Sequence, residues 1–188
     1  SAPVPMKCIQ VEHPTRTYLA GRHYTVTHNT QLVSIGRVLW EIGHNPNIRV
    51  CIIQAAEHLA ESIVSTIKRY IEHSAEFKEV FPEIRRGDVW TTTMFNVERP
   101  GNIKDPTVIA TGVHGNILGR RFDLVIIDDA VTGDNSATDY MREDVFKWLQ
   151  STPKSRLTRK ARIWALGNAW HNSDAMHRFA KMAGWRAF

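Results

Sequence analysis

The chain has 188 residues, of which 43% are hydrophobic and 23% charged, and its formal net charge is +5. This composition is that of an ordinary globular protein rather than a disordered chain, and the length indicates one domain able to bury a core. No apolar run approaches the roughly 20 residues of a membrane span, and no signal peptide opens the chain, so we expect no membrane partner. The two cysteines, Cys8 and Cys51, lack metal-ligand spacing, which favours a reducing cytoplasm.

The positive charge is concentrated near the C-terminal end, where residues 151–188 contain a single acid, Asp174. Such a cluster attracts a nucleic-acid backbone in a salt-dependent way that ignores base sequence. The alternative is a solvated face without a ligand. The basic residues of this segment are Lys154, Arg156, Arg159, Lys160, Arg162, Arg178, Lys181 and Arg186.

The first half of the chain changes character at Thr30. Residues 7–29, rich in Thr, Val, Tyr and His, predict short strands broken at His13-Pro14 and Ala20-Gly21. From Thr30 the spacing of apolar residues predicts an amphipathic helix over 30–43, and the continuous apolar run at 48–55 predicts a buried parallel strand. A second helix is expected at about 57–74, from apolar residues four apart: Leu59, Ile63, Ile67 and Ile71.

The second half continues this alternation. Residues 106–113 and 122–130 predict two more buried strands, joined by a Gly-bearing loop. A helix at about 137–150 precedes a strand at 161–170, and a last helix at 173–184 opens with a Ser/Asp cap. The residues after it, 185–188, could begin another strand. Alternating strands and helices imply crossover connections, and therefore an α/β fold with a mostly parallel sheet flanked by helices.

The strand at 122–130 ends in paired acids, Asp128 and Asp129, after four apolar residues. A carboxylate at the carboxyl end of a parallel strand can hold Mg²⁺ through its waters, beside the phosphates of a nucleotide. A second acid can orient or deprotonate an attacking water. The pattern is typical of a Walker B element; the alternative is a pair of acids that merely ends a strand.

The run "ALGNAWHNSDAMHRF", residues 165–179, resembles the strand-end motif of the large terminase subunits of tailed phages. In that motif a Gly-Thr or Met-Thr pair precedes Arg-Trp-His and an acid. The stretches "EHLAESIVSTIKRYIEHSAEFKEVFPEI" and "GRRFDLVIIDDAV" resemble the same family, so the resemblance runs from Thr30 to the end of the chain. The matching motif positions are Gly167, Trp170, His171 and Asp174, and the Thr and Arg positions are held by Asn168 and Ala169.

This resemblance implies a P-loop NTPase fold that binds ATP and Mg²⁺. Asp128 would be the Mg²⁺-associated acid, and Asp129 would stand in place of the usual catalytic Glu. Arg120 or Arg121 could act in trans as an arginine finger on the ATP of a neighbouring subunit; the alternative for either residue is a surface ion pair. The residues that couple hydrolysis to movement would be Gly167, Asn168 and His171.

At the level of the whole protein, the resemblance implies a viral DNA-packaging motor. The expected partners are double-stranded DNA, contacted nonspecifically, the capsid portal and the small terminase subunit. The working form would be a homo-oligomeric ring in the cytoplasm of an infected bacterial host, and the full protein would add a metal-dependent nuclease domain.

The phosphate loop that should precede such a helix is missing. The loop reads G-x-x-x-x-G-K-[ST], but in "TVTHNT" only Thr30 fits. Counting back from Thr30, Asn29 stands at the Lys position, and His28 and His23 stand at the glycines. The loop needs glycines because its backbone adopts positive φ, and it needs the Lys charge on the phosphates. One explanation is therefore a decayed, non-functional loop.

The other explanation is protein splicing. Residues 8–29, "CIQVEHPTRTYLAGRHYTVTHN", resemble the C-terminal splicing region of inteins, including the step at 18–21 and the final His-Asn before a hydroxyl residue. The Asn29 side chain would attack its own carbonyl carbon to form a succinimide, and His28 would donate to the developing oxyanion. The Thr30 hydroxyl would accept the acyl group of the upstream protein half. His13 or His23 could assist.

We therefore expect two parts. Residues 1–29 form a β-rich splicing segment in which Ser1 is not the nucleophile, and residues 30–188 form most of a terminase ATPase domain. The glycines and Lys of the loop belong to an upstream half, so the chain alone is inactive as an ATPase. Thr30 then serves twice, as splicing acceptor and as Mg²⁺ ligand. The alternatives are a degenerate, non-hydrolysing P-loop-fold module for DNA binding or assembly, and a helicase-like ATPase with the same core.

Overall fold

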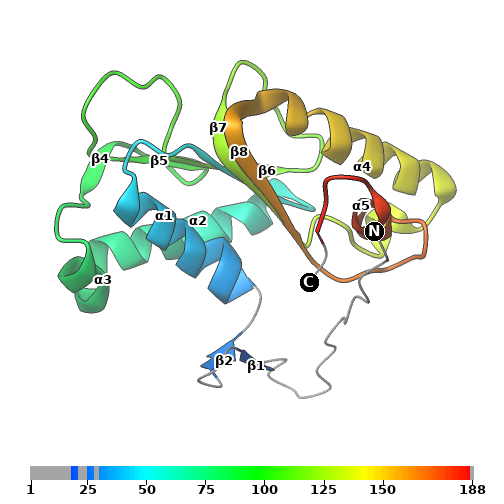
Figure 1. Ribbon diagram of the computed structural model, residues 1–188, viewed down its shortest axis with the longest axis horizontal. Helices are drawn as coiled ribbons and strands as arrows, with labels where there is room; N and C mark the ends of the chain where they lie inside the picture. Colours follow the sequence, from blue (N-terminus) through cyan, green and yellow to red (C-terminus); the bar gives the residue numbers. More distant parts are fainter. Residues whose placement is uncertain (1–17, 21–24, 28–29, 187–188) are drawn as a thin grey trace.

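A six-stranded sheet with helices on both faces forms the body of the protein (Figure 1). The structure, a computed structural model, describes residues 18–20, 25–27 and 30–186. The strand order is β4-β5-β6-β3-β7-β8, in which β6, β3, β7 and β8 are mutually parallel and β5 runs antiparallel to both of its neighbours, β4 and β6. The bounds are β3 (Val50–Gln54), β4 (Arg86–Trp90), β5 (Met94–Val97), β6 (Val108–Gly112), β7 (Phe122–Asp128) and β8 (Leu157–Leu166).

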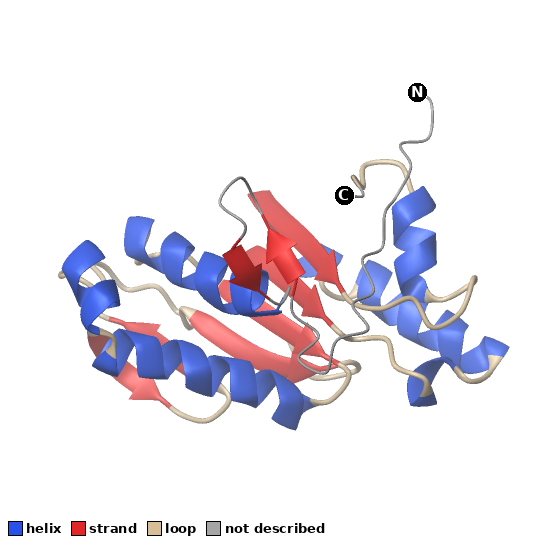
Figure 2. Ribbon diagram, turned by 90° about the horizontal axis from the view of Figure 1, so that it is seen from below, coloured by secondary structure: helices blue, strands red, loops and turns tan. Residues whose placement is uncertain are grey.

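Helices cover the two faces of this sheet in two groups (Figure 2). The helices η1, α1, α2 and α3 pack on one face, and α4 and α5 pack on the other (Figure 1). Among the described residues, none of the helices has the length and apolar content needed to cross a membrane. The bounds are η1 (Thr30–Arg37), α1 (Val38–His44), α2 (Glu57–His73), α3 (Ala75–Val80), η2 (Asp134–Ser136), α4 (Asp139–Ser151), η3 (Lys154–Arg156) and α5 (Ala175–Lys181).

The central strands are apolar on both faces because both are covered by helices. In β3, Val50 and Ile52 belong to the hydrophobic cluster under α1 and α2, whereas Cys51 and Ile53 belong to the cluster under α4 and α5. Successive side chains of a strand point to opposite faces, so a strand buried between two layers is a continuous apolar run. The parallel strands predicted at 48–55, 106–113 and 122–130 are therefore confirmed as β3, β6 and β7.

The N-terminal segment contributes a small antiparallel hairpin, in which β1 (Tyr18–Ala20) pairs with β2 (Thr25–Thr27). Its two strands lie within the region where short strands were predicted, with the predicted break after Ala20. The third expected strand of this region, near residues 8–13, lies outside the described residues.

Several predicted boundaries were wrong. The last helix ends at Lys181 rather than at Gly184, whose positive φ of 90° would in any case favour glycine. Strand β8 begins at Leu157, earlier than predicted, and residues 185–186 are not in a strand. Leu59 is 41% exposed although its spacing placed it on the buried face of α2. The β4–β5 hairpin and α3 were not predicted.

Candidate active site

Polar side chains from two strands and one helix lie at the carboxyl edge of the parallel strands, beside the end of a third strand. Gln54 ends β3, Asp128 ends β7 and is followed by Asp129, and Leu166 ends β8. Thr30 begins helix η1 at the same edge, because its hydroxyl contacts Asp128. The carboxyl ends of parallel strands are where α/β proteins place their ligands, so this edge is the candidate active site.

Two hydroxyl groups hold the buried carboxylate of Asp128. Thr30 Oγ1 donates to Asp128 Oδ1 at 3.2 Å, and Ser34 Oγ donates to Asp128 Oδ2 at 2.7 Å. Asp128 and Ser34 are both inaccessible to solvent. Thr30 and Ser34 are four residues apart in η1 and therefore lie on one face of the helix, so the start of this helix is fixed to the end of β7. The structure thus brings together Thr30 and Asp128, which the sequence analysis had named separately as Mg²⁺-binding residues.

Burial raises the pKa of the Asp128 carboxyl above its ordinary value, and the neighbouring charge of Asp129 acts in the same direction. Hydrogen bonds from Ser34, Thr30 and Gln54 oppose this rise. A carboxylate that is desolvated beside a second acid gains strongly from a cation, which neutralises the pair. Among the described residues, the recorded partners of this carboxyl are hydroxyl and amide groups rather than a basic side chain.

Asp129 is held in an unusual backbone conformation beside the end of β8. Its φ is 46°, and its N–H donates to the carbonyl oxygen of Leu166 at 3.0 Å. The backbone N–H of Asn168 donates to the Asp129 carboxylate, while burial raises the pKa of this group. Non-glycine residues at positive φ cluster at functional sites, where the surrounding structure compensates for the strain. The second acid of the pair is therefore positioned by two backbone contacts from the β8 strand end.

Gly167 makes this close approach of β8 to Asp129 feasible. A Cβ at position 167 would lie 3.1 Å from Asp129 Oδ1, and the φ of Gly167 is 146°. Any side chain would therefore press on the carboxylate and strain the backbone. A glycine is therefore required at this position of the predicted coupling motif, because only a residue without a side chain lets the end of β8 approach Asp129.

The remaining residues of that motif lie further from the acid pair. His171 is exposed, and its Nδ1 lies 2.9 Å from Ser173 Oγ. Asp174 is buried and caps α5, accepting hydrogen bonds from the backbone N–H groups of Trp170, His171 and His177. Burial alone would raise the pKa of Asp174, but these bonds hold it below its ordinary value. The motif thus contains two residues that approach Asp129, Gly167 and Asn168, and one helix cap, Asp174.

The arginines at 120 and 121 lie before β7, at the end of the strand opposite to Asp128. Seven residues of strand separate the two ends, which is roughly 20 Å. Arg121 donates from its guanidinium to the carbonyl oxygen of Ser155 at 2.9 Å. Neither arginine is therefore placed to serve the acid pair of its own chain, and the role in trans stays a prediction.

Two site residues were missed by the sequence analysis, Ser34 and Gln54. The sequence signals that could have found them were the four-residue spacing of Ser34 from Thr30 and the polar residue, Gln54, at the end of the apolar run.

The predicted splicing residues His28 and Asn29 lie outside the described residues. Within the described part of the chain, no cluster of three or more His, Cys, Asp or Glu side chains could bind a metal unaided. A magnesium site requires fewer protein ligands, because Mg²⁺ is commonly coordinated by one or two carboxylates and completes its coordination shell with water and phosphate oxygens.

The pKa directions predict how an Asp128→Asn substitution changes stability. The pKa of Asp128 is higher in the folded than in the unfolded chain. The contribution of this carboxyl to folding stability is therefore fully present below its ordinary pKa of 3.8, and it is lost as the pH rises through the raised pKa of the folded state. The neutral amide should therefore stabilise the chain at pH 7 by about 1 kcal/mol, or roughly 2–4 °C in Tm. The gain should vanish on acidification below the ordinary value. Thermal unfolding followed by circular dichroism across this range measures it; a variant less stable than wild type at pH 7 would contradict it.

Comparison with known proteins shows a distant likeness to a phage protein. The chain is 27% identical over 113 residues to the large subunit of the terminase of Enterobacteria phage T3. The match covers 60% of this chain and 19% of that protein, so the chain spans about a fifth of its relative. No protein-family model matches the chain.

Proposed function

We propose that residues 30–188 are the larger part of the ATPase domain of a DNA-packaging motor. The observation that carries the proposal is the arrangement of Thr30, Asp128 and Asp129. A hydroxyl at the start of a helix contacts a buried acid at the end of a central parallel strand, and a second acid follows directly. In P-loop ATPases the Ser or Thr of the loop and the acid of the strand end together hold Mg²⁺.

The oxygen donors fit Mg²⁺ and the phosphates of ATP. Thr30 Oγ1 and the Asp128 carboxylate are hard oxygen ligands 3.2 Å apart, and Ser34 holds the second carboxylate oxygen. Thr30 would bind the ion directly and Asp128 through water. When bound, the ion supplies positive charge to the β- and γ-phosphates. The described residues supply no Gly-rich loop with a Lys, so the remaining phosphate contacts must come from an upstream piece.

Asp129 is the proposed general base. Burial raises its pKa, which brings the carboxylate closer to the proton affinity needed near neutral pH. The water oxygen would form a bond to the γ-phosphorus as the bond to the ADP oxygen breaks. The proton of that water passes to Asp129, whose carboxylate is oriented by the N–H of Asn168. Asp129 is one methylene shorter than a glutamate, and its positive φ and the close approach of Gly167 set where the carboxylate lies.

Residues 1–29 are the proposed C-terminal segment of an intein. Its support is the residue pattern up to His28-Asn29 together with the β1–β2 hairpin over the predicted strands. Excision would join Thr30 to the Lys of an upstream half and complete the phosphate loop.

The exposed basic residues Arg159 and Lys160 of β8 are proposed to contact DNA phosphates. The working motor is proposed to be a ring at the portal.

The direct test compares the 188-residue chain with the ligated protein that begins in the upstream half. Isothermal titration calorimetry should detect no ATP binding to the chain alone, because the Lys and the backbone cradle of the phosphates are missing. The ligated protein should bind ATP and hydrolyse it with Mg²⁺. Micromolar ATP affinity of the chain alone would contradict the proposal. If the ligated protein binds DNA but does not hydrolyse ATP, the degenerate assembly module is the better description.

A further inference from the structure

Ser34 differs from three other hydroxyl residues that lie within helices of this protein. Ser62, Thr66 and Ser151 each donate to a backbone carbonyl oxygen three or four residues earlier in their own helix. This is the usual bond of a hydroxyl group inside a helix. Ser34 Oγ instead donates to Asp128 Oδ2 at 2.7 Å, although the two residues are 94 positions apart in the sequence. The Ser34 hydroxyl is therefore directed out of its helix and toward the acid of the candidate site.

Packing alone would favour a small apolar side chain at position 34. Ser34 is inaccessible to solvent, and its neighbours in the chain, Ile35 and Val38, belong to the hydrophobic cluster on this face of the sheet. Burying a hydroxyl group is unfavourable unless it forms a hydrogen bond. The helix η1 that carries Ser34 is a π-helix, a rare form that frequently occurs at functional sites. These observations favour a role of Ser34 in the site over a role in packing.

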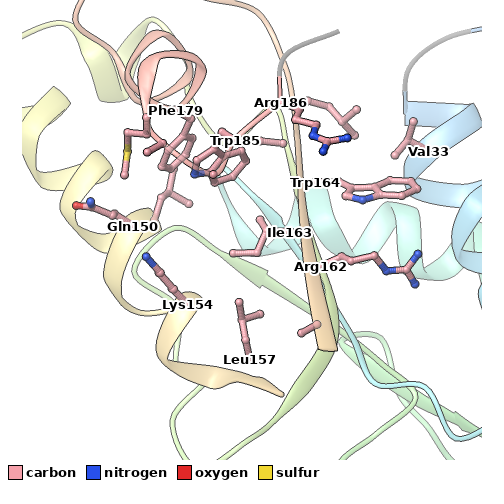
Figure 3. Close-up of a pocket in the computed structure, with 17 residues that line it drawn as sticks. Val33, Gln150, Lys154, Leu157, Arg162, Ile163, Trp164, Phe179, Trp185 and Arg186 are labelled. Carbon is pink, nitrogen blue, oxygen red and sulfur yellow. The ribbon is translucent and has the colours of Figure 1, made fainter. Parts of the chain in front are cut away.

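Contacts with β8 hold the rest of this helix and so keep the serine hydroxyl in place. The side chain of Val33 in η1 lies toward that of Trp164 in β8, and both line a cavity of about 980 Å³ along this strand (Figure 3). The Arg37 guanidinium lies 5.3 Å from the ring centroid of Trp164. Glu41, which follows in α1, forms ion pairs with Arg37 and with Arg162 of β8. The helix is therefore fixed to the sheet on both sides of its buried serine.

The two hydroxyl groups that contact Asp128 differ in how firmly they are held. Thr30 is the first residue of η1, is only partly buried, and its Oγ1 lies 3.2 Å from Asp128 Oδ1. Ser34 lies four residues further into the helix, and its 2.7 Å bond to Oδ2 is buried. The ends of helices open more readily than their interiors. Ser34 therefore makes the firmer of the two contacts.

We propose that Ser34 is the positioning residue of Asp128: its hydroxyl fixes the direction of the carboxylate, and the Thr30 hydroxyl does not. Hydrogen bonds from residues outside the coordination shell commonly orient the ligands of metal ions in this way. With Oδ2 bonded to Ser34, Oδ1 stays on the side of Thr30. Thr30 Oγ1 can then turn from Oδ1 to a cation without releasing the carboxylate. The turn toward a cation rests on the proposed function, whereas the bond between Ser34 and Asp128 does not.

NMR spectroscopy of the 188-residue chain tests the positioning role without ATP. The three-bond couplings of Asp128 Cγ to the backbone nitrogen and carbonyl carbon report whether this side chain keeps one staggered rotamer. We expect the couplings of a single rotamer in the wild type and in Thr30→Ala. Averaged couplings are expected in Ser34→Ala, because only this substitution removes the bond to Oδ2. Ser34→Thr keeps a hydroxyl group at this position and should restore the couplings of a single rotamer.

Matched variants separate the loss of this hydrogen bond from a general change in packing. Ser62→Ala removes a hydroxyl group bonded at 2.7 Å within α2 and should leave the Asp128 couplings unchanged. Ser34→Cys nearly keeps the side-chain volume but supplies only a weak donor, so its couplings should be averaged as in Ser34→Ala. Circular dichroism checks that each variant folds. If Ser34→Ala does not fold, Ser34→Cys supplies the measurement.

Binding of Mn²⁺ to the same chain measures the consequence for a cation. Mn²⁺ accepts the same carboxylate and water ligands as Mg²⁺, and its paramagnetic broadening of the Asp129 amide signal reports binding beside the acid pair. Ser34→Ala should weaken this binding by about 10-fold or more, as the loss of a residue that orients a metal ligand usually does. Ser62→Ala should bind Mn²⁺ as the wild type does.

Three results would overturn the proposal. The first is averaged Asp128 couplings in the wild type, or single-rotamer couplings in both Ser34→Ala and Ser34→Cys. The second is averaged couplings in Thr30→Ala, which would assign the role to Thr30. The third is averaging in Gln54→Ala but not in Ser34→Ala, since Gln54 also hydrogen-bonds this carboxyl. If the couplings behave as expected but Mn²⁺ does not bind near Asp128, Ser34 keeps its positioning role and the proposed function loses its cation site.

Discussion

Replacing Asp129 by Asn in the ligated protein is expected to lower kcat for ATP hydrolysis by about 10²–10⁴-fold, the usual contribution of a positioned general base. The amide keeps the size of the side chain, and it can still accept the hydrogen bond from the N–H of Asn168. It cannot accept a proton from the attacking water. ATP affinity should therefore change little, because Thr30 and Asp128 are untouched. Steady-state phosphate release and nucleotide titration measure the two effects separately.

Two companion variants sharpen this result. Asp134→Asn makes the same chemical change at an exposed acid soon after β7 and should leave kcat unchanged. Asp129→Glu restores the residue usual in the resembled family and should retain activity if its longer side chain fits beside Gly167. Full activity of Asp129→Asn would remove Asp129 from the chemistry and leave it a structural residue at the end of β7.

Replacing Thr30 by Ala is expected to abolish two different reactions, whereas Thr30→Ser should preserve both. In the precursor, the hydroxyl is the nucleophile that accepts the upstream acyl group, so Ala should give no ligated product. In a protein encoded as already joined, the same hydroxyl contacts Asp128 and would bind Mg²⁺, so Ala should lower kcat by at least about 10²-fold. Intact-protein mass spectrometry reads the first effect and phosphate release reads the second.

Asn29→Ala separates the two roles of this junction. It removes the amide that forms the succinimide, so the precursor should fail to release residues 1–29. The protein encoded as already joined contains no Asn29 and should hydrolyse ATP at the wild-type rate. If Thr30→Ala blocks ligation but the joined Thr30→Ala protein is fully active, then Thr30 is a splicing residue alone.

The sequence predicted the central part of the fold because its signals are strong there. Strands such as β3 and β7 are buried on both faces and appear as uninterrupted apolar runs. Local signals fail at the borders of the sheet. Strands β4 and β5 are short, β4 has no buried residue, and no two-residue turn joins them. The first residues of β8 are charged, so the sequence analysis placed them outside the strand, although an edge strand tolerates charge.

The sequence analysis named those candidate site residues that can be recognised from residue type and local order alone. The acid pair and Thr30 stand out by residue type and order. Ser34 does not, because its partner lies 94 residues away and a serine within a helix has no distinctive signal. The reason for Gly167 was likewise hidden, since its contact with Asp129 depends on the pairing of β7 with β8. Long-range geometry, rather than residue type, supplied these parts of the site.

Mass spectrometry of the protein made from the reading frame together with its upstream coding DNA tests the central claim most directly. That claim is that a self-excising segment ends at Asn29 and that Thr30 begins the ATPase part. We expect a junction peptide in which a Gly-rich loop ending in Lys is joined directly to Thr30-Gln31-Leu32, together with a released fragment whose C-terminal residue is Asn29. A mature protein that retains residues 1–29 covalently attached to Thr30, with no such junction peptide, would contradict the claim.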